Sequence, residues 1–228
     1  MASLLAAAIF FVGIHLLLAG TELRWQITAK IGEEAFQSIF ALLSLGGGII
    51  WLCRAYGQAE YLELWGQVQS MRWLALLVML PAFFLAGLAF TSPNPTAVRG
   101  GAWLKESDPA KGIERITRHP FLWGVVLWSV THLIYNGDLG SLVFFSSFLV
   151  LALRGPFSID RKRKRAHGAD WERFAAVTSN VPFVAIVQGR NKLSFREIGW
   201  WRIVVIAVLY AGFLHLHKSL FGVSPLPM

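Results

Sequence analysis

Long stretches without a charged side chain are the feature that most restricts how this chain can fold. Residues 1–21 contain no Asp, Glu, Lys or Arg. Similar apolar blocks cover 35–53, 73–90, 120–135, 139–153 and 198–216, the last with one charged residue, Arg202. A helix needs about 20 apolar residues to cross the hydrocarbon core of a bilayer. We therefore predict an all-α, polytopic membrane helical bundle with about six transmembrane helices, formed by residues 1–228 as a single domain.

The composition supports a membrane protein and argues against a nucleic-acid partner. Of the residues, 55% are hydrophobic and only 15% are charged, whereas soluble domains carry about 25% charged residues. A net charge of +8 would suggest nucleic acid for a soluble protein, but basic loops set the orientation of a membrane protein. We therefore expect membrane lipids as partners. The single cysteine, Cys53, excludes an intrachain disulfide and any Cys-rich metal site.

The apolar runs 120–135 and 139–153 predict a short helical hairpin. The turn between them is Asn136-Gly137-Asp138, and Asn, Gly and Asp are favoured in turns. Pro120 suits the first position of a helix. Each arm is about 24 Å long at 1.5 Å per residue. The hairpin either spans a thinned bilayer or lies buried among the other helices.

Two further segments are expected at the membrane surface. Trp171, Phe174 and Val177 recur at helical spacing after Gly168, which predicts a cytoplasmic amphipathic helix lying on the membrane. The connection 54–72 mixes polar residues with Tyr and Trp, so we expect it at the interface as well.

The distribution of basic residues predicts the orientation. With six spans, eighteen of the 21 Lys and Arg fall on the connections after the first, third and fifth spans. The positive-inside rule places these basic loops in the cytoplasm. In a bacterial inner membrane both termini would then be periplasmic.

Four histidines lie in or beside the apolar blocks: His15, His132, His215 and His217. Each could simply form hydrogen bonds between helices. Together they also suggest metal ligation, because neutral imidazole is a common metal ligand and two histidines can hold a haem iron. On straight helices His132 matches His215 or His217 in depth, while His15 lies about 10 Å nearer the cytoplasmic end.

The remaining candidate residues flank His132 along the hairpin. Trp128, His132 and Asn136 share one helix face, beside Ser129. They form either a packed stripe or a pocket in which Asn136 orients His132. Arg118 and His119 directly precede the helix. They either cap its start at the membrane interface, where Arg118 binds phospholipid phosphate, or contact a substrate or anion.

The chain resembles the NnrU family of bacterial membrane proteins over nearly its whole length. The matching stretches are Asn94-Pro95-Thr96, Gly112-Ile113, Thr117-Arg118-His119-Pro120, Leu127-Trp128, His132-Leu133, Asn136-Gly137-Asp138 and the ending 220–227. The family is associated with nitrite and nitric oxide metabolism in denitrifying bacteria. The resemblance therefore implies a role in that metabolism.

The better-understood relative of this family is the plant 15-cis-zeta-carotene isomerase, a membrane enzyme that binds haem b. The resemblance implies haem b here, with its metal ligands at His15 and His132, and a hydrophobic or small inorganic substrate. It disagrees with the depth match to His215. The relative is also thought to offer a cysteine as an alternative haem ligand near the hairpin histidine. Ser129 stands at the corresponding position here, which argues against a redox-linked exchange of histidine for cysteine in this chain.

Two other hypotheses compete with a haem protein. Arg118-His119-Pro120 with Asp160 also resembles membrane methyltransferases of lipid or prenylated substrates, but basic residues follow Asp160 where glutamates are expected. A non-enzymatic accessory protein would use its histidines for packing and its basic face for anionic lipid. Histidine-ligated iron favours electron transfer or one-electron lipid chemistry, such as polyene isomerisation, over hydrolysis.

Overall fold

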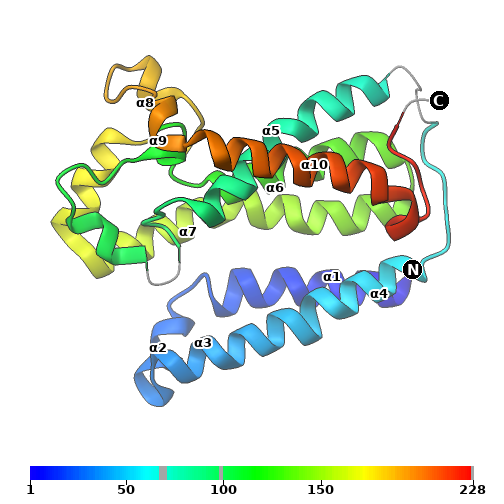
Figure 1. The fold of residues 1–228 in the computed structure, drawn as a ribbon. Helices are drawn as coiled ribbons and strands as arrows, with labels where there is room; N and C mark the ends of the chain where they lie inside the picture. The colour runs from blue at the N-terminus through cyan, green and yellow to red at the C-terminus, as the bar shows by residue number, and fades with distance from the viewer. Residues whose placement is uncertain (67–70, 98–99, 227–228) are drawn as a thin grey trace. The chain divides into compact units, whose positions relative to one another are not determined.

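The computed structural model describes residues 1–66, 71–97 and 100–226, and these form an all-α protein (Figure 1). Over these ranges no β-strand forms, and one isolated bridge joins Glu63 and Asp138. The predicted all-α membrane bundle is confirmed.

Four helical stretches are long and apolar enough to cross a bilayer by length and composition. They are Glu33–Gly57, Met71–Thr91, Leu139–Val177 and Trp200–Phe221. The pair Ala2–Leu18 and Leu23–Ile31, bent by 76°, gives a fifth if it is counted as one span. The remaining apolar helix, Pro120–Asn136, has 17 residues, which is short of the roughly 20 that a span needs. These numbers agree roughly with the predicted six spans.

The described chain divides into two compact units. The first contains Met1–Val68 and Ser129–Arg154, and the second contains Gln69–Trp128 and Gly155–Met228. Helices α6 (Pro120–Asn136) and α7 (Leu139–Val177) each contribute to both units. The prediction of one domain over 1–228 stays a prediction.

The first unit is built from short helices that continue one another. Its elements are α1 (Ala2–Gly13), π-helical η1 (Ile14–Leu18), α2 (Leu23–Ile31), α3 (Glu33–Leu42), π-helical η2 (Leu43–Ile50) and α4 (Trp51–Gly57). Glycine lets α1 approach η2 closely, because a Cβ at Gly47 would lie 2.9 Å from the Phe10 ring and one at Gly48 2.8 Å from Phe11. Gly47 and Gly48 thus allow the close helix approach that small residues give in membrane bundles.

The connection after α4 packs on the hairpin turn. The backbone amides of Leu64 and Trp65 donate to the carbonyl of Gly137. A Cβ at Gly137, whose φ is +69°, would lie 2.2 Å from the Trp65 carbonyl oxygen, so the turn requires glycine. The interfacial location predicted for 54–72 stays a prediction, and residues 67–70 lie outside the described ones.

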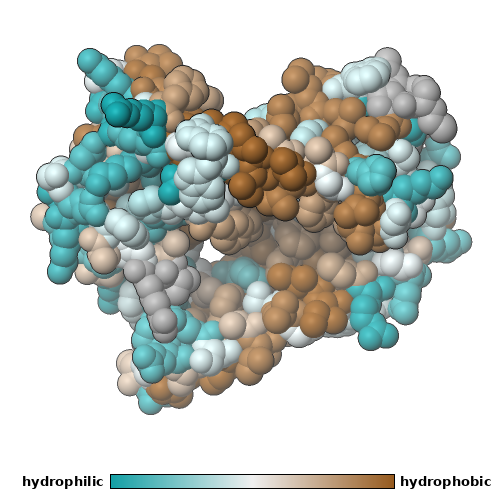
Figure 2. Space-filling model, viewed as in Figure 1, coloured by the Kyte–Doolittle hydropathy of each residue, from teal (hydrophilic) through white to brown (hydrophobic). Residues whose placement is uncertain are grey.

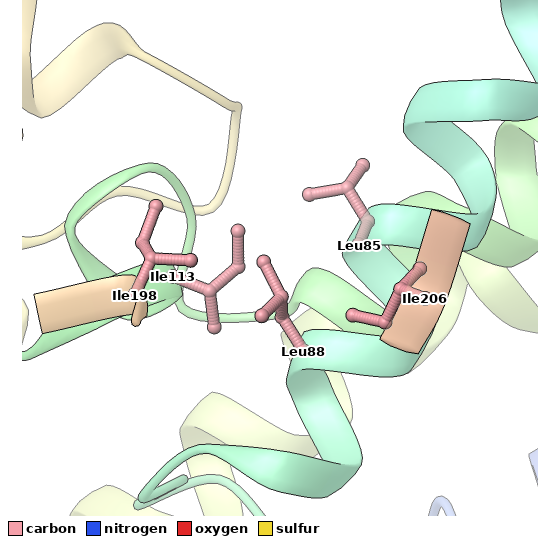
Figure 3. Packing of buried hydrophobic residues seen from close by; sticks show 5 residues of the cluster. All are labelled: Leu85, Leu88, Ile113, Ile198 and Ile206. Carbon is pink, nitrogen blue, oxygen red and sulfur yellow. The ribbon is translucent and has the colours of Figure 1, made fainter. Parts of the chain in front are cut away.

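In the second unit, two long helices and two short elements pack around a buried hydrophobic core. It holds α5 (Met71–Thr91), the 3₁₀ turns η3 (Gly100–Lys105) and η4 (Gly112–Arg115), α8 (Val184–Val187), α9 (Phe195–Ile198) and α10 (Trp200–Phe221). Figure 3 shows the side chains of the core converging: Leu85, Leu88, Ile113, Ile198 and Ile206. This core fixes η4 and α9 against α5 and α10.

Helix α7 is longer than the predicted second arm of the hairpin. It continues past Leu153 through the basic run to Val177, with a kink at Gly168 (φ 48°, ψ −119°). The predicted amphipathic helix therefore forms as the last part of α7. Its apolar face differs from our expectation, because Trp171 and Phe174 are buried against Leu104 and Ala110, not turned out toward a membrane.

Candidate functional site

His15 lies in the π-helical turn η1 and has a defined tautomer. Its Nδ1 lies 2.7 Å from the carbonyl oxygen of Phe11, and a carbonyl can only accept, so Nδ1 carries the hydrogen. In a neutral ring Nε2 then holds the lone pair and accepts from the hydroxyl of Ser44 at 3.2 Å. A metal-ligating histidine usually donates its other ring N–H to a carbonyl or carboxylate, which fixes the tautomer and the ring orientation.

The π-helical geometry places these two residues opposite each other. Ser44 lies in η2 and His15 in η1, and π-helical turns in proteins are frequent at functional sites. The rings of Phe11 and Phe40 contact the imidazole edge to face, at centroid distances of 4.7 and 5.1 Å. His15 is thus held in an aromatic, apolar setting.

His132 belongs to the same unit and is half-buried on α6. Its ring stacks on Phe145 at 4.7 Å with an interplanar angle of 20°. A continuous series of contacts between aromatic rings connects this histidine with His15. The series runs through Phe145, Phe144, Phe148 and Phe11, and the centroids of neighbouring phenylalanine rings are 5.0 to 5.2 Å apart.

Asn136 closes α6 and is part of a polar network at the hairpin turn. Its amide donates to the Ser141 hydroxyl at 3.0 Å and approaches the Tyr56 hydroxyl at 3.5 Å. The Tyr56 and Ser141 hydroxyls are 2.7 Å apart, and Asp138 Oδ1 accepts the amide of Ser141 at 2.9 Å. Asn136 therefore ties α4 to the start of α7.

The other predicted pocket residues lie in different surroundings. Trp128 belongs to the second unit, where it lines a groove of about 290 Å³ between α5, α6 and α10 whose lining residues are all apolar. Ser129 is fully buried, and its hydroxyl has no hydrogen-bond partner among the described residues. His215 is exposed on α10 in the second unit, and His217 Nδ1 donates to the carbonyl of Val223.

Arg118 and His119 converge on Asp160 of α7. Arg118 Nε and Nη2 donate to Oδ2 at 3.0 and 2.7 Å, and His119 Nε2 lies 2.7 Å from Oδ1. The guanidinium of Arg118 stabilises the ionised form of Asp160. The carboxylate can therefore only accept, so His119 Nε2 carries the hydrogen. Asp160 thus occupies the position that an external anion would take between the two side chains.

The second ring nitrogen of His119, Nδ1, carries a buried lone pair. The side chain is 2% exposed, and Nδ1 has no partner among the described residues. Burial lowers the pKa of His119, and the hydrogen bond to Asp160 only partly opposes this. His119 is therefore neutral near pH 7.

Glu114 in η4 is a second buried titratable group. It is fully buried, and neither carboxyl oxygen has a hydrogen-bond partner among the described residues. Burial raises its pKa well above the ordinary value, and the charge of Arg118 acts in the opposite direction. The fold therefore favours the protonated form of Glu114.

Sequence reasoning missed several partners of the candidate residues. Ser44, Tyr56 and Asp160 come from helices far along the chain from the residues they bind, and only Asp160 was noticed, through the resemblance to membrane methyltransferases. No pattern in the sequence singles out Glu114. Its burial depends on packing against elements that the sequence does not pair.

The residues of the first unit fit haem b in their donor chemistry. Haem iron is often held by histidine imidazole nitrogens, and apolar walls suit its flat macrocycle. His15 offers a lone pair at Nε2, His132 lies in the same unit, and phenylalanine rings connect them. In the described ranges no group of three or more His, Cys, Asp or Glu could hold a metal ion, so the histidine pair is the candidate.

These features define an all-α membrane protein with imidazoles set among aromatic side chains. The family model of the NnrU protein matches residues 3–225, and the chain belongs to the NnrU family.

Two curated relatives are 15-cis-zeta-carotene isomerases of the chloroplast. The Arabidopsis thaliana protein is 29% identical over 204 residues, covering 85% of this chain and 54% of the relative. The Zea mays protein is 28% identical over 192 residues, covering 83% and 52%. The chain therefore spans about half the length of the relatives it matches. No solved structure matches it.

Proposed function

We propose that this protein is a haem b-dependent isomerase of a polyene lipid in a bacterial inner membrane. The observation that carries the proposal is the arrangement of His15, whose Nε2 lone pair is set by the Phe11 carbonyl in the same unit as His132. The relation to two 15-cis-zeta-carotene isomerases supports a polyene as the substrate class.

His15 and His132 would hold the haem, and the iron would supply one-electron chemistry to the bound polyene. The Phe11 carbonyl keeps His15 in the ligating tautomer. The Ser44 hydroxyl, which now bonds Nε2, would turn away when the nitrogen binds iron. The phenylalanine rings that contact the two histidines would keep water from the site.

The absorption spectrum of the detergent-purified protein, as isolated and after dithionite, tests this proposal. We expect a Soret band that His15→Ala and His132→Ala each weaken or remove. His167→Ala is the matched control, because His167 lies in the polar, basic part of α7. A band lost in His215→Ala and kept in His15→Ala would replace the ligand pair by His132 with His215. No band after added haem would overturn the proposal.

The substrate is tested by incubating the haem-loaded protein with 15-cis-zeta-carotene and separating the isomers by chromatography. We expect conversion to the trans isomer that His132→Ala abolishes. Nitrite or nitric oxide metabolism, the other expectation from the family resemblance, would use the same iron. A Soret shift on adding nitric oxide, with no polyene converted, would favour that role.

The proposed orientation places the basic loops in the cytoplasm and both termini in the periplasm. It is supported by the charge asymmetry, with eighteen of 21 Lys and Arg on one side. A C-terminal reporter that is active only outside the cytoplasm should be active. An inactive reporter there, with an active one in the loop before α6, would reverse the orientation.

A further inference from the structure

An exposed apolar surface lies outside the membrane-spanning helices, in the segment between α7 and α10. We call it the 181–200 surface. Its members are Val181 (50% exposed), Phe183 (51%), Val187 (83%), Phe195 (70%) and Trp200 (77%). Figure 2 shows hydrophobic residues gathered at the upper left, over the region where Figure 1 places α8. Exposed apolar residues on α5 or α10 face hydrocarbon, but 181–196 belongs to no span.

The backbone of this segment is held firmly by the rest of its unit. The Phe183 amide donates to the Ile116 carbonyl at 2.8 Å, and the Thr117 hydroxyl donates to the Asn180 carbonyl at 2.5 Å. At the other end, Arg190 Nη1 donates to the carbonyl of Thr178 at 2.6 Å. The apolar side chains are therefore presented on a fixed framework and are not the tip of a loose loop.

Phe183 has a backbone conformation that needs an explanation. Its φ of +67° is the only positive value at a non-glycine position among the described residues. A bulky residue in this region is strained and persists where the surroundings enforce it. The strained conformation starts α8, which places Val187, the most exposed member of the surface, one turn further on.

The charges around the surface are positive. Lys192 and Arg196 are exposed beside Phe195. The one carboxylate in this part of the chain, Glu197, is bound by Arg115 through two hydrogen bonds of 2.7 and 2.8 Å. Apolar side chains beside exposed cations are typical of surfaces that bind anionic lipid.

Continuity with α10 identifies the occupant as the bilayer itself. Trp200 is both a member of the surface and the first residue of α10, a candidate span. The chain therefore enters hydrocarbon directly after the surface ends, and Trp at such a boundary sits at headgroup level. We propose that the 181–200 surface is an interfacial anchor, inserted into the headgroup region of the leaflet where α10 begins and selective for anionic lipid.

A fluorescent probe at Val187 tests the anchor. With Cys53, the only cysteine, replaced by serine, Val187→Cys is labelled with an environment-sensitive dye. The protein is reconstituted in phosphatidylcholine vesicles, alone or mixed with phosphatidylglycerol, containing lipids with a shallow nitroxide. Lys164→Cys is the control, because its side chain is 65% exposed in the polar part of α7.

We expect the probe at 187 to be blue-shifted and quenched by the nitroxide lipid, and the probe at 164 to be neither. Phe195→Cys should repeat the result from a second position. Equal water exposure at 187 and 164 would overturn the proposal. A probe shielded at 187 but not quenched would show that protein, not lipid, covers the surface.

The lipid selectivity has its own test. Replacing Lys192 and Arg196 by glutamine should reduce quenching at 187 in the mixed vesicles and leave it unchanged in phosphatidylcholine alone. Each cation near an anionic surface should strengthen insertion about fivefold. Equal quenching in the two vesicle types, before and after the substitutions, would remove the anionic selectivity from the proposal.

Discussion

Replacing Asp160 by asparagine should destabilise the second unit strongly, because among the described residues Asp160 is the only carboxylate that pairs with Arg118. Asparagine keeps Oδ1 as an acceptor for His119 Nε2, which now lies 2.7 Å away. The substitution therefore removes the negative charge and leaves the shape unchanged. What remains is the Arg118 guanidinium, 16% exposed, without a counter-charge.

The burial of this pair sets the size of the effect. Removing one partner of a fully buried ion pair costs about 3–5 kcal/mol. Asp160 keeps 24% of its side chain exposed, so solvent screens part of the charge. We expect a loss of about 2–3 kcal/mol of unfolding free energy. For a chain of this size that lowers the melting temperature by roughly 4–12 °C.

Thermal unfolding in detergent, followed by tryptophan fluorescence, measures this loss. Asp170→Asn is the matched control on the same helix, since Asp170 pairs with Arg173 at 3.6 Å and is 44% exposed. An exposed pair of this kind contributes about 0–1 kcal/mol. If Asp160→Asn melts no lower than Asp170→Asn, the three groups do not form a stabilising cluster and the argument is refuted.

Three further changes test packing and protonation in the same unfolding assay. Gly124→Ala should lower the unfolding free energy by about 1–3 kcal/mol, because the added methyl group would lie 2.9 Å from the carbonyl oxygen of Ala82. Gly212→Ala is the control and should be neutral, because its methyl group would have nothing within 4 Å. Equal effects of the two substitutions would contradict the packing of α6 on α5. Glu114→Gln should raise stability at neutral pH, because burial raises the pKa of Glu114 above 4.5 and the unfolded chain, but not the native one, loses that proton as pH rises. Parallel stability curves of the wild type and this variant above pH 4.5 would show that Glu114 is ionised when folded. Tyr56→Phe should cost about 1 kcal/mol through the lost hydroxyl bonds at the hairpin turn, and an unchanged midpoint would mean that those bonds add no stability.

Much of the fold could be predicted because membrane helices are determined locally. An uncharged apolar block must pair its backbone groups internally once it leaves water, so it forms a helix wherever it packs. This is why the helices starting at Pro120 and Leu139 and the turn at Gly137 lie where the sequence indicated. The lengths were less predictable, and α7 continues to Val177 because its polar part packs on other loops.

The candidate site was predictable only in part. His15 and His132 stood out as imidazoles in apolar blocks, and they do lie in one unit. The hydrogen-bond partners that fix His15, the Phe11 carbonyl and Ser44, depend on the π-helical geometry of two segments, which no residue pattern signals. The depth comparison with His215 assumed straight helices, whereas the helical stretches Ala2–Leu18 and Leu23–Ile31 meet at a 76° bend.

The sequence by itself determined the class of this protein, the position of its helices and its family, because these depend on local composition and on ordered motifs. Only the tertiary structure decided which groups meet across long stretches of chain, such as His119 with Asp160. It also decided what covers each apolar face. The helical spacing of Trp171 and Phe174 indicates an apolar face that is shielded from water. It does not indicate whether lipid or another part of the protein, here Leu104, packs on that face. The hydrophobic effect is not directional, so the occupant of an apolar face is settled by the shape of the whole fold.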